Sequence, residues 1–287
     1  MTRPSLAEEV RDLWHRSQEG DLDVTNVTED HLETLEVFLA ALETGEIRAA
    51  EPAGSGDRTA EEWRVNSWVK QGILLNFALR DTKPREYGGV TYHDVLALRE
   101  TDDLGHRGTR NTPDGTTIRR GVYVGGDAIL MSPCFVNAGA YVDDGTLVDS
   151  CDTVGSCAQI GCDVKLGANT LIGGVLEPVE DTPVIVEDGV SIGAGCRITS
   201  GFVVGADSVV GENTLLTPRI PVYDLVTDEI VYGFVPPERR VFTRFVESAM
   251  GEHELFGSGG AYKPAAVATD LEVETLEATA REELLRT

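Results

Sequence analysis

The side chains that most often carry catalysis are unevenly distributed along this chain of 287 residues. All five histidines lie outside residues 118–222, namely His15, His31, His93, His106 and His253. Imidazole is a common zinc ligand and a frequent general base. Residues 118–222 therefore lack both the usual ligands of a catalytic zinc ion and a histidine base, which disfavours a zinc-dependent carbonic anhydrase.

The cysteines show the opposite distribution. All five fall within residues 118–222, namely Cys134, Cys151, Cys157, Cys162 and Cys196. None belongs to a CxxC pair, the spacing that is typical of zinc ribbons and redox sites. We therefore expect buried free thiols in this segment and no metal site.

The segment that contains the cysteines and excludes the histidines follows a six-residue repeat. Aliphatic side chains recur at every sixth position from Ile118 to Ile172 and, after a shift of two residues, from Val186 to Val222, which makes 17 hexads. The residue after the aliphatic one is often Gly, Asn or Asp, types that tolerate a positive φ and suit a corner. Small or β-branched residues stand four positions after the aliphatic one.

One short strand and one corner per hexad, with three hexads per coil, close a triangular prism. The pattern predicts a mainly β fold, a left-handed parallel β-helix of nearly six coils over residues 118–222. The register shift contains Pro178 and Pro183, so we expect a loop at about residues 178–185 that leaves the prism. Loops on a rigid scaffold often carry binding residues.

The flanks of the prism lack this repeat. Residues 1–117 predict an N-terminal helical domain and a connector, of which residues 81–117 are polar and irregular. Residues 223–287 predict a C-terminal hairpin and an acidic tail. Because an open prism exposes unpaired strand edges at both ends, we expect the flanks to act as caps.

Charge and hydropathy exclude further classes. There are 24 Lys and Arg residues against 49 Asp and Glu residues, a net charge of −25, which disfavours nucleic acid as a partner. Only four of the basic residues are lysines, and this combination suggests adaptation to molar salt. No run approaches the roughly 18 apolar residues of a membrane span. The N-terminus has no apolar signal segment, so we expect a cytoplasmic protein with no membrane partner.

Several motifs carry a family resemblance. Residues 131–149 read MSPCFVNAGAYVDDGTLVD, residues 153–161 read TVGSCAQIG, and residues 173–178 read GGVLEP. Together with WVK at residues 68–70, YGFVP at 232–236 and ELLRT at 283–287, they resemble the tetrahydrodipicolinate N-succinyltransferase family over nearly the whole chain.

This resemblance implies a homotrimer with active sites in clefts between neighbouring prisms. It further implies transfer of succinyl from succinyl-CoA, a co-substrate, to the amino group of ring-opened tetrahydrodipicolinate, on the route to diaminopimelate and lysine. No permanently bound cofactor is expected. The amine must lose a proton as it attacks the thioester, and without a histidine in the prism a carboxylate must orient or deprotonate it.

The resemblance also assigns candidate site residues. Asp149, at the end of the first motif, matches the substrate-binding aspartate of the family. Arg110 resembles its substrate-binding arginine, although a rigid register would give Asn111. Arg119 is a second candidate for binding a substrate carboxylate.

One position departs from the family pattern. Where relatives often carry a glutamate that could be a catalytic base, this chain has Arg197. Glu177 is the alternative catalytic candidate, with anchoring of the adjacent loop as its competing role.

Two other functions remain open at this stage. The first is transfer of acetyl from acetyl-CoA to the same acceptor, which the long C-terminal extension disfavours. For the succinyl donor, Lys263 or Arg239 could meet the terminal carboxylate. The second is a non-catalytic trimeric scaffold, which leaves the substrate motif unexplained. The first 80 residues contain no Gly-rich nucleotide loop, which disfavours a nucleotidyltransferase.

Overall fold

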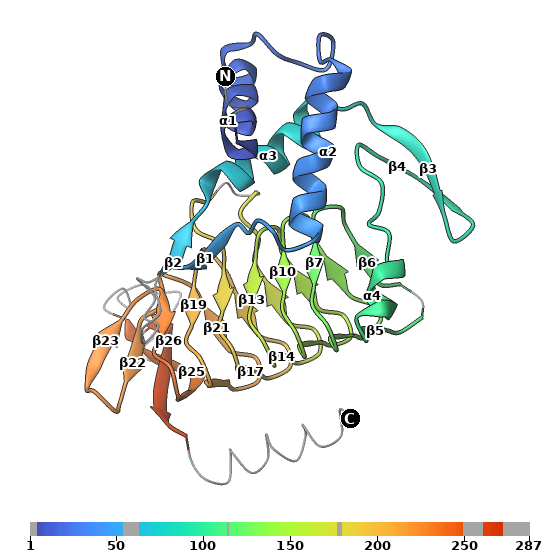
Figure 1. Cartoon of the computed structure of the whole chain (residues 1–287). Helices are drawn as coiled ribbons and strands as arrows, with labels where there is room; N and C mark the ends of the chain where they lie inside the picture. Colours follow the sequence, from blue (N-terminus) through green and yellow to red (C-terminus); the bar gives the residue numbers. More distant parts are fainter. Residues whose placement is uncertain (1–4, 54–62, 114, 177–179, 249–260, 272–287) are drawn as a thin grey trace.

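The computed structural model describes residues 5–53, 63–113, 115–176, 180–248 and 261–271. Its centre is a left-handed parallel β-helix in which three sheets form the faces of a prism (Figure 1). Each coil of the chain contributes one short strand to each sheet. The fold class predicted from the repeat is therefore confirmed.

The three sheets follow one another around each coil. The first sheet contains β7 (Tyr123–Val124), β10 (Tyr141–Val142), β13 (Gln159–Ile160), β16 (Ile185–Val186), β19 (Val203–Val204) and β24 (Phe234–Val235). The second contains β5 (Arg110–Asn111), β8 (Ile129–Leu130), β11 (Leu147–Val148), β14 (Lys165–Leu166), β17 (Ser191–Ile192), β20 (Val209–Val210) and β25 (Arg239–Ser248). The third contains β6 (Thr117–Ile118), β9 (Phe135–Val136), β12 (Thr153–Val154), β15 (Leu171–Ile172), β18 (Arg197–Ile198) and β21 (Leu215–Leu216).

The second residue of each short strand fills the prism. Val142, for example, is fully buried and lies in register between Val124 of the preceding coil and Ile160 of the following coil. The aliphatic side chains of all three sheets join in one hydrophobic cluster. Their removal from water is the main source of stability for this part of the fold.

The corners differ from the sequence prediction in one respect. Residues with positive φ lie three positions after the aliphatic residue, as at Asp163 and Asn169, and not directly after it. The glycines that follow the aliphatic residue are required for close approach between coils. A Cβ on Gly155 would lie 2.3 Å from the nitrogen of Gly174, and a Cβ on Gly161 would lie 2.3 Å from a carboxylate oxygen of Asp188.

The N-terminal domain packs against the prism through helices and a small sheet. It contains α1 (Leu6–Glu19), α2 (Glu29–Glu43), α3 (Ser67–Ala78), β1 (Ala50–Pro52) and β2 (Trp63–Val65). Two capping boxes, at Ser5 and Thr28, start the first two helices. Trp63 belongs to β2 and not to a helix of the predicted helical domain, and its indole nitrogen donates to the buried carboxylate of Glu187. No helix in the described residues is long and apolar enough to cross a membrane.

The connector is more ordered than predicted. It forms an antiparallel ribbon of β3 (Lys83–Tyr87) and β4 (Val90–Asp94), then α4 (Asp102–His106), and only then enters the prism. The ribbon projects from the molecule (Figure 1) and most of its residues are exposed on both sides. The prediction of irregular structure was wrong here because a ribbon exposed on both sides has no alternation of apolar and polar residues.

The C-terminal end of the prism is closed by added strands. Val222 begins β22 (Val222–Asp224), which pairs with β23 (Glu229–Val231) and β26 (Ala261–Asp270) and not with the stack of the prism. The coils continue instead through β24 and the start of β25, and β25 then pairs antiparallel with β26. The acidic tail predicted within residues 223–287 lies outside the described residues except for Leu271.

Candidate active site

Asp149 lies at the corner between the second and third sheets, directly after β11. Its Oδ1 accepts a hydrogen bond of 2.7 Å from the backbone nitrogen of Ser150. The hydroxyl of Ser150 in turn donates to the carbonyl oxygen of Ser132 on the preceding coil, at 3.0 Å. The carboxylate is therefore held at a turn that is hydrogen-bonded both within itself and to the preceding coil.

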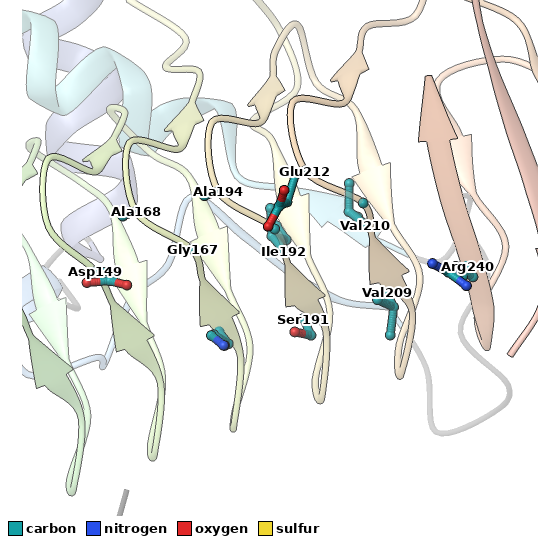
Figure 2. Close-up of a pocket in the computed structure, with 13 residues that line it drawn as sticks. Asp149, Gly167, Ala168, Ser191, Ile192, Ala194, Val209, Val210, Glu212 and Arg240 are labelled. Carbon is teal, nitrogen blue, oxygen red and sulfur yellow. The ribbon is translucent and has the colours of Figure 1, made fainter. Parts of the chain in front are cut away.

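A groove of about 560 Å³ begins at Asp149 and runs along the second sheet to β25 (Figure 2). It crosses β11, β14, β17, β20 and β25, four strand spacings or roughly 19 Å. Its lining side chains are small or aliphatic except for four charged residues, Asp149, Lys165, Glu212 and Arg240. The lining residues are Asp149, Lys165, Gly167, Ala168, Ser191, Ile192, Gly193, Ala194, Val209, Val210, Gly211, Glu212 and Arg240. An extended ligand with one polar end would fit along such a groove.

Neither cation of this groove was among the site residues predicted from the sequence. Lys165 lies on β14. Arg240 lies on β25, at the opposite end of the groove from Asp149 (Figure 2). Arg239, which the sequence suggested as a cation for the donor, has another partner. Its Nε lies 3.1 and 3.2 Å from the two carboxylate oxygens of the fully buried Asp224. Lys263 lies on β26, pairs with Val246 and does not line the groove.

Arg110 lies on the same sheet as Asp149. Strand β5 pairs with β8, which pairs with β11, so Arg110 is two strand spacings, about 10 Å, from the strand that ends at Asp149. The side chain is exposed, and one guanidinium nitrogen lies 3.5 Å from the sulfur of Met131. The neighbouring Asn111 is also exposed.

Arg119 lies at a different edge, between the third and first sheets. It forms an ion pair with Asp94, and its guanidinium carbon is 5.1 Å from the ring centre of Phe77. It lines a second groove of about 490 Å³, between α3 and the third sheet. Asp149 follows a strand of the second sheet and Arg119 follows a strand of the third, so one chain does not bring the two together.

The other catalytic candidate, Glu177, lies outside the described residues. Leu176, the residue before it, lines the second groove together with Arg119. Arg197, which replaces the expected glutamate, starts β18. Its guanidinium donates to the carbonyl oxygens of Asn169, Gly195 and Cys196 and so stabilises a corner of the prism. A guanidinium cannot replace the carboxylate base that the family pattern suggests.

The thiols are largely as predicted. Cys134, Cys157 and Cys196 are buried, Cys162 is partly buried, and only Cys151 is exposed, which contradicts the prediction at that position. Burial raises the pKa of Cys134 and Cys196 to about 11, so these thiols stay protonated near neutral pH. Among the described residues no group of three His, Cys, Asp or Glu side chains could hold a metal ion.

Known proteins share both the N-terminal part and the full length of this chain. Residues 5–79 match the family model described as tetrahydrodipicolinate N-succinyltransferase N-terminal. A 2,3,4,5-tetrahydropyridine-2,6-dicarboxylate N-succinyltransferase of Dechloromonas aromatica is 35% identical, with 100% of both chains covered. Enzymes of the same name from Xylella fastidiosa and a Methylobacterium species are each 36% identical, over 98% and 83% of both chains respectively.

Among solved structures, a hexapeptide transferase family protein from Anaplasma phagocytophilum covers 70% of this chain and 91% of its own. Its TM-score is 0.31 and its sequence identity is 12%. The fold of this chain is therefore assigned from its own strand pairing.

Proposed function

The chain belongs to the tetrahydrodipicolinate N-succinyltransferase family, and on that premise we propose that it transfers succinyl from succinyl-CoA to an amino group. The acceptor is the ring-opened form of tetrahydrodipicolinate, and the reaction belongs to diaminopimelate and lysine biosynthesis. The observation that supports this most directly is the groove that starts at Asp149 and continues along four further strands.

The bond changes define what the site must do. The amine nitrogen attacks the thioester carbonyl carbon, a C–N bond forms, the C–S bond breaks, and the CoA thiol leaves with the proton that the amine loses. Asp149 binds and orients the amine, because its carboxylate lies at the end of the groove where the thioester would end. The oxyanion needs N–H donors other than the glycine nitrogens beside the groove, because Gly167, Gly193 and Gly211 already donate to carbonyl oxygens of the next coil.

The groove suits the arm of an acyl-CoA. Its floor of glycine, alanine and valine leaves room for an extended chain, and its two cations can meet anionic groups of the donor. Lys165 is the cation closer to Asp149, one strand spacing away, and we assign the succinyl carboxylate to it. Arg240, at the far end, is placed to meet a phosphate of the coenzyme.

We further propose that a second copy of the chain completes the site, as in a homotrimer. The acceptor has two carboxylates. Arg110 lies on the second sheet and Asp149 at the edge that follows it, while Arg119 lies at the edge between the third and first sheets. If neighbouring prisms pack side by side, the Arg119 edge of one chain can face the Asp149 edge of the next.

The test is release of CoA thiol from succinyl-CoA, with 2-aminopimelate as acceptor, in molar KCl. Release that depends on the acceptor would support the proposal. The same assay with acetyl-CoA distinguishes the donor, because release with acetyl-CoA alone would identify an N-acetyltransferase. Release with neither donor from an intact oligomer would favour a non-catalytic scaffold.

A further inference from the structure

A second carboxyl group lies behind Asp149 in the same turn. Asp152 is only 1% exposed and occupies the inward position of its hexad. The equivalent positions of the neighbouring coils hold uncharged side chains, namely Cys134, Thr170, Cys196 and Thr214. A buried carboxyl group is costly unless hydrogen bonds compensate for the lost water.

Two backbone groups provide that compensation. Asp152 Oδ2 accepts a hydrogen bond of 2.8 Å from the nitrogen of Asp149, and Oδ1 accepts one of 2.7 Å from the nitrogen of Thr170 on the following coil. The backbone nitrogen of Asp152 donates back to the carbonyl oxygen of Asp149, at 3.3 Å. Asp152 thus ties the backbone of Asp149 to the next coil of the prism.

The carboxylate of Asp149 is fixed on one side only. Ser150 donates to its Oδ1, whereas no hydrogen bond from the described part of the chain reaches its Oδ2. With the backbone held by Asp152 and one oxygen held by Ser150, the second oxygen has a defined place beside the groove. A bound amine can use that oxygen without reorganising the turn.

We propose that Asp152 is a positioning residue for the acceptor amine, acting through the backbone of Asp149. This inference rests on the proposed role of Asp149 in binding the amine. Asp152 itself is buried and does not touch the substrate, so its influence must pass through the geometry and the charge of the turn.

The charge of Asp152 makes this influence depend on pH. Burial raises the pKa of Asp152 to about 8, and the nearby charge of Asp149 adds to the rise, although the two backbone donors favour the ionised form. On the preceding coil Cys134 faces Asp152, and burial raises the pKa of that thiol to about 11, so it stays neutral. Thr170, on the following coil, does not titrate.

Asp152 is therefore mainly protonated at pH 6.5 and mainly ionised at pH 9. Ionisation places a second negative charge beside Asp149, which favours a positively charged amine in the groove. The wild-type enzyme should hold its acceptor more tightly above the pKa of Asp152. An asparagine at this position carries no charge at any pH and keeps one of the two acceptors, because its amide nitrogen cannot accept a hydrogen bond.

The experiment compares the KM for 2-aminopimelate at saturating succinyl-CoA in the wild type and Asp152→Asn. We expect the two KM values to agree within about twofold at pH 6.5 and to differ by roughly tenfold at pH 9, with the variant weaker. The amine of the acceptor titrates in both enzymes, so the ratio of the KM values isolates Asp152. Asp152→Ala, which removes both acceptors as well as the charge, should raise KM by roughly tenfold at pH 6.5 and by roughly 100-fold at pH 9.

Thr146→Val is the matched control. Thr146 is fully buried at the equivalent position of another corner, where its hydroxyl accepts from the nitrogen of Val164 at 3.1 Å. It should lose stability without changing the KM for the acceptor. Equal KM values for wild type and folded Asp152→Asn at pH 9 would overturn the inference, whereas absence of turnover in the wild type would overturn the proposed function.

A second measurement needs no variant. Binding that favours ionised Asp152 must release protons near pH 8, and calorimetry of 2-aminopimelate binding to the wild type in buffers of different ionisation enthalpy detects them. Binding at pH 8 without proton release would also overturn the inference.

Discussion

The first and second sheets of the prism are built from the same hexad, yet the N-terminal domain covers the outer face of the first sheet and a groove runs along the outer face of the second. The outer positions of the first sheet are Tyr123, Tyr141, Gln159, Ile185, Val203 and Phe234. The N-terminal domain covers this face, with Ala50 packed against Ile185 and Val203. The outer positions of the second sheet are Arg110, Ile129, Leu147, Lys165, Ser191, Val209 and Arg240, and this face carries the groove.

The difference shows that the repeat supplies a scaffold, and that the outward side chains decide whether a face is covered by the N-terminal domain or carries the groove. Inward residues are nearly interchangeable among the three sheets, because each only has to fill the prism. Aromatic and amide side chains on the first sheet contact the N-terminal domain. Arg48 of that domain donates to Gln159, and its guanidinium carbon lies 3.6 Å from the ring centre of Tyr141. Cations and small residues on the second sheet leave that face available to a ligand.

The strongest test of this contrast replaces one carboxylate at the corner after each sheet: Asp149 after the second sheet and Asp143 after the first. Asp149→Asn should lower kcat/KM by about 10³-fold, equivalent to about 4 kcal/mol, because the amide cannot bind or orient the amine as a carboxylate does. Asp143→Asn is the matched control. Asp143 stands at the same hexad position after the first sheet and likewise accepts from the next backbone nitrogen, Asp144, at 3.0 Å.

Asp143→Asn should leave kcat/KM within about twofold of the wild type. Steady-state kinetics of both variants with succinyl-CoA give the comparison. If both lost activity equally, the carboxylates would share a structural role and the assignment of Asp149 would be wrong.

The next effect concerns stability on the covered face. The ring of Tyr141 stacks on Tyr123, with centres 4.4 Å apart, and meets the guanidinium of Arg48 on its other side. Tyr141→Ala should therefore lower the free energy of unfolding by about 3 kcal/mol. Leu147→Ala, at the outer position of the second sheet on the same coil, should cost only about 1 kcal/mol. Urea denaturation measures both, and equal losses would show that the N-terminal cover does not stabilise the first sheet.

These contrasts also show what the sequence could reveal. The aliphatic residue at every sixth position is a local signal with one structural solution, so the fold class and most strands follow from it. Asp149 follows from a contiguous motif. Lys165 carried a signal that we missed, because residues 129, 147 and 165 recur every 18 residues and share one outer face.

Arg240 carried no such signal. It lines the groove because β25 pairs with β20, some 30 residues earlier, across an excursion through β22 and β23 whose length no repeat dictates. Successive residues of a strand face opposite sides, so Arg239 turns to the buried Asp224 and Arg240 to the groove. The partnership of Asp149 and Asp152 was likewise invisible, because small and acidic residues both occur near corners.

A smaller effect should follow from Lys165 on the open face. Lys165→Gln removes the cation nearest the thioester end of the groove and should raise the KM for succinyl-CoA by roughly tenfold, with kcat within about twofold. Lys83→Gln, on the exposed ribbon, is the control for loss of one lysine charge. A raised KM for the acceptor with an unchanged KM for the donor would contradict the assignment of the donor carboxylate to Lys165.

The smallest effect concerns the two edges that border the second sheet. The edge between the first and second sheets carries Asp127, Asp163 and Asp207 at positive φ, on alternate coils. At the same corner position of the opposite edge, Asn169 and Asn213 adopt nearly the same φ, so asparagine fits this conformation. Asp163→Asn with Asp207→Asn therefore removes charge without backbone strain.

In a chain of net charge −25, this substitution should relieve repulsion that salt otherwise screens. We expect the melting temperature of the wild type to rise between dilute buffer and molar KCl, and the double variant to melt about 2 °C higher than the wild type in dilute buffer only. Thermal unfolding followed by circular dichroism checks both. A wild-type melting temperature that does not change with KCl would refute the adaptation to molar salt, and a variant advantage that persists in molar KCl would point to local packing instead of charge.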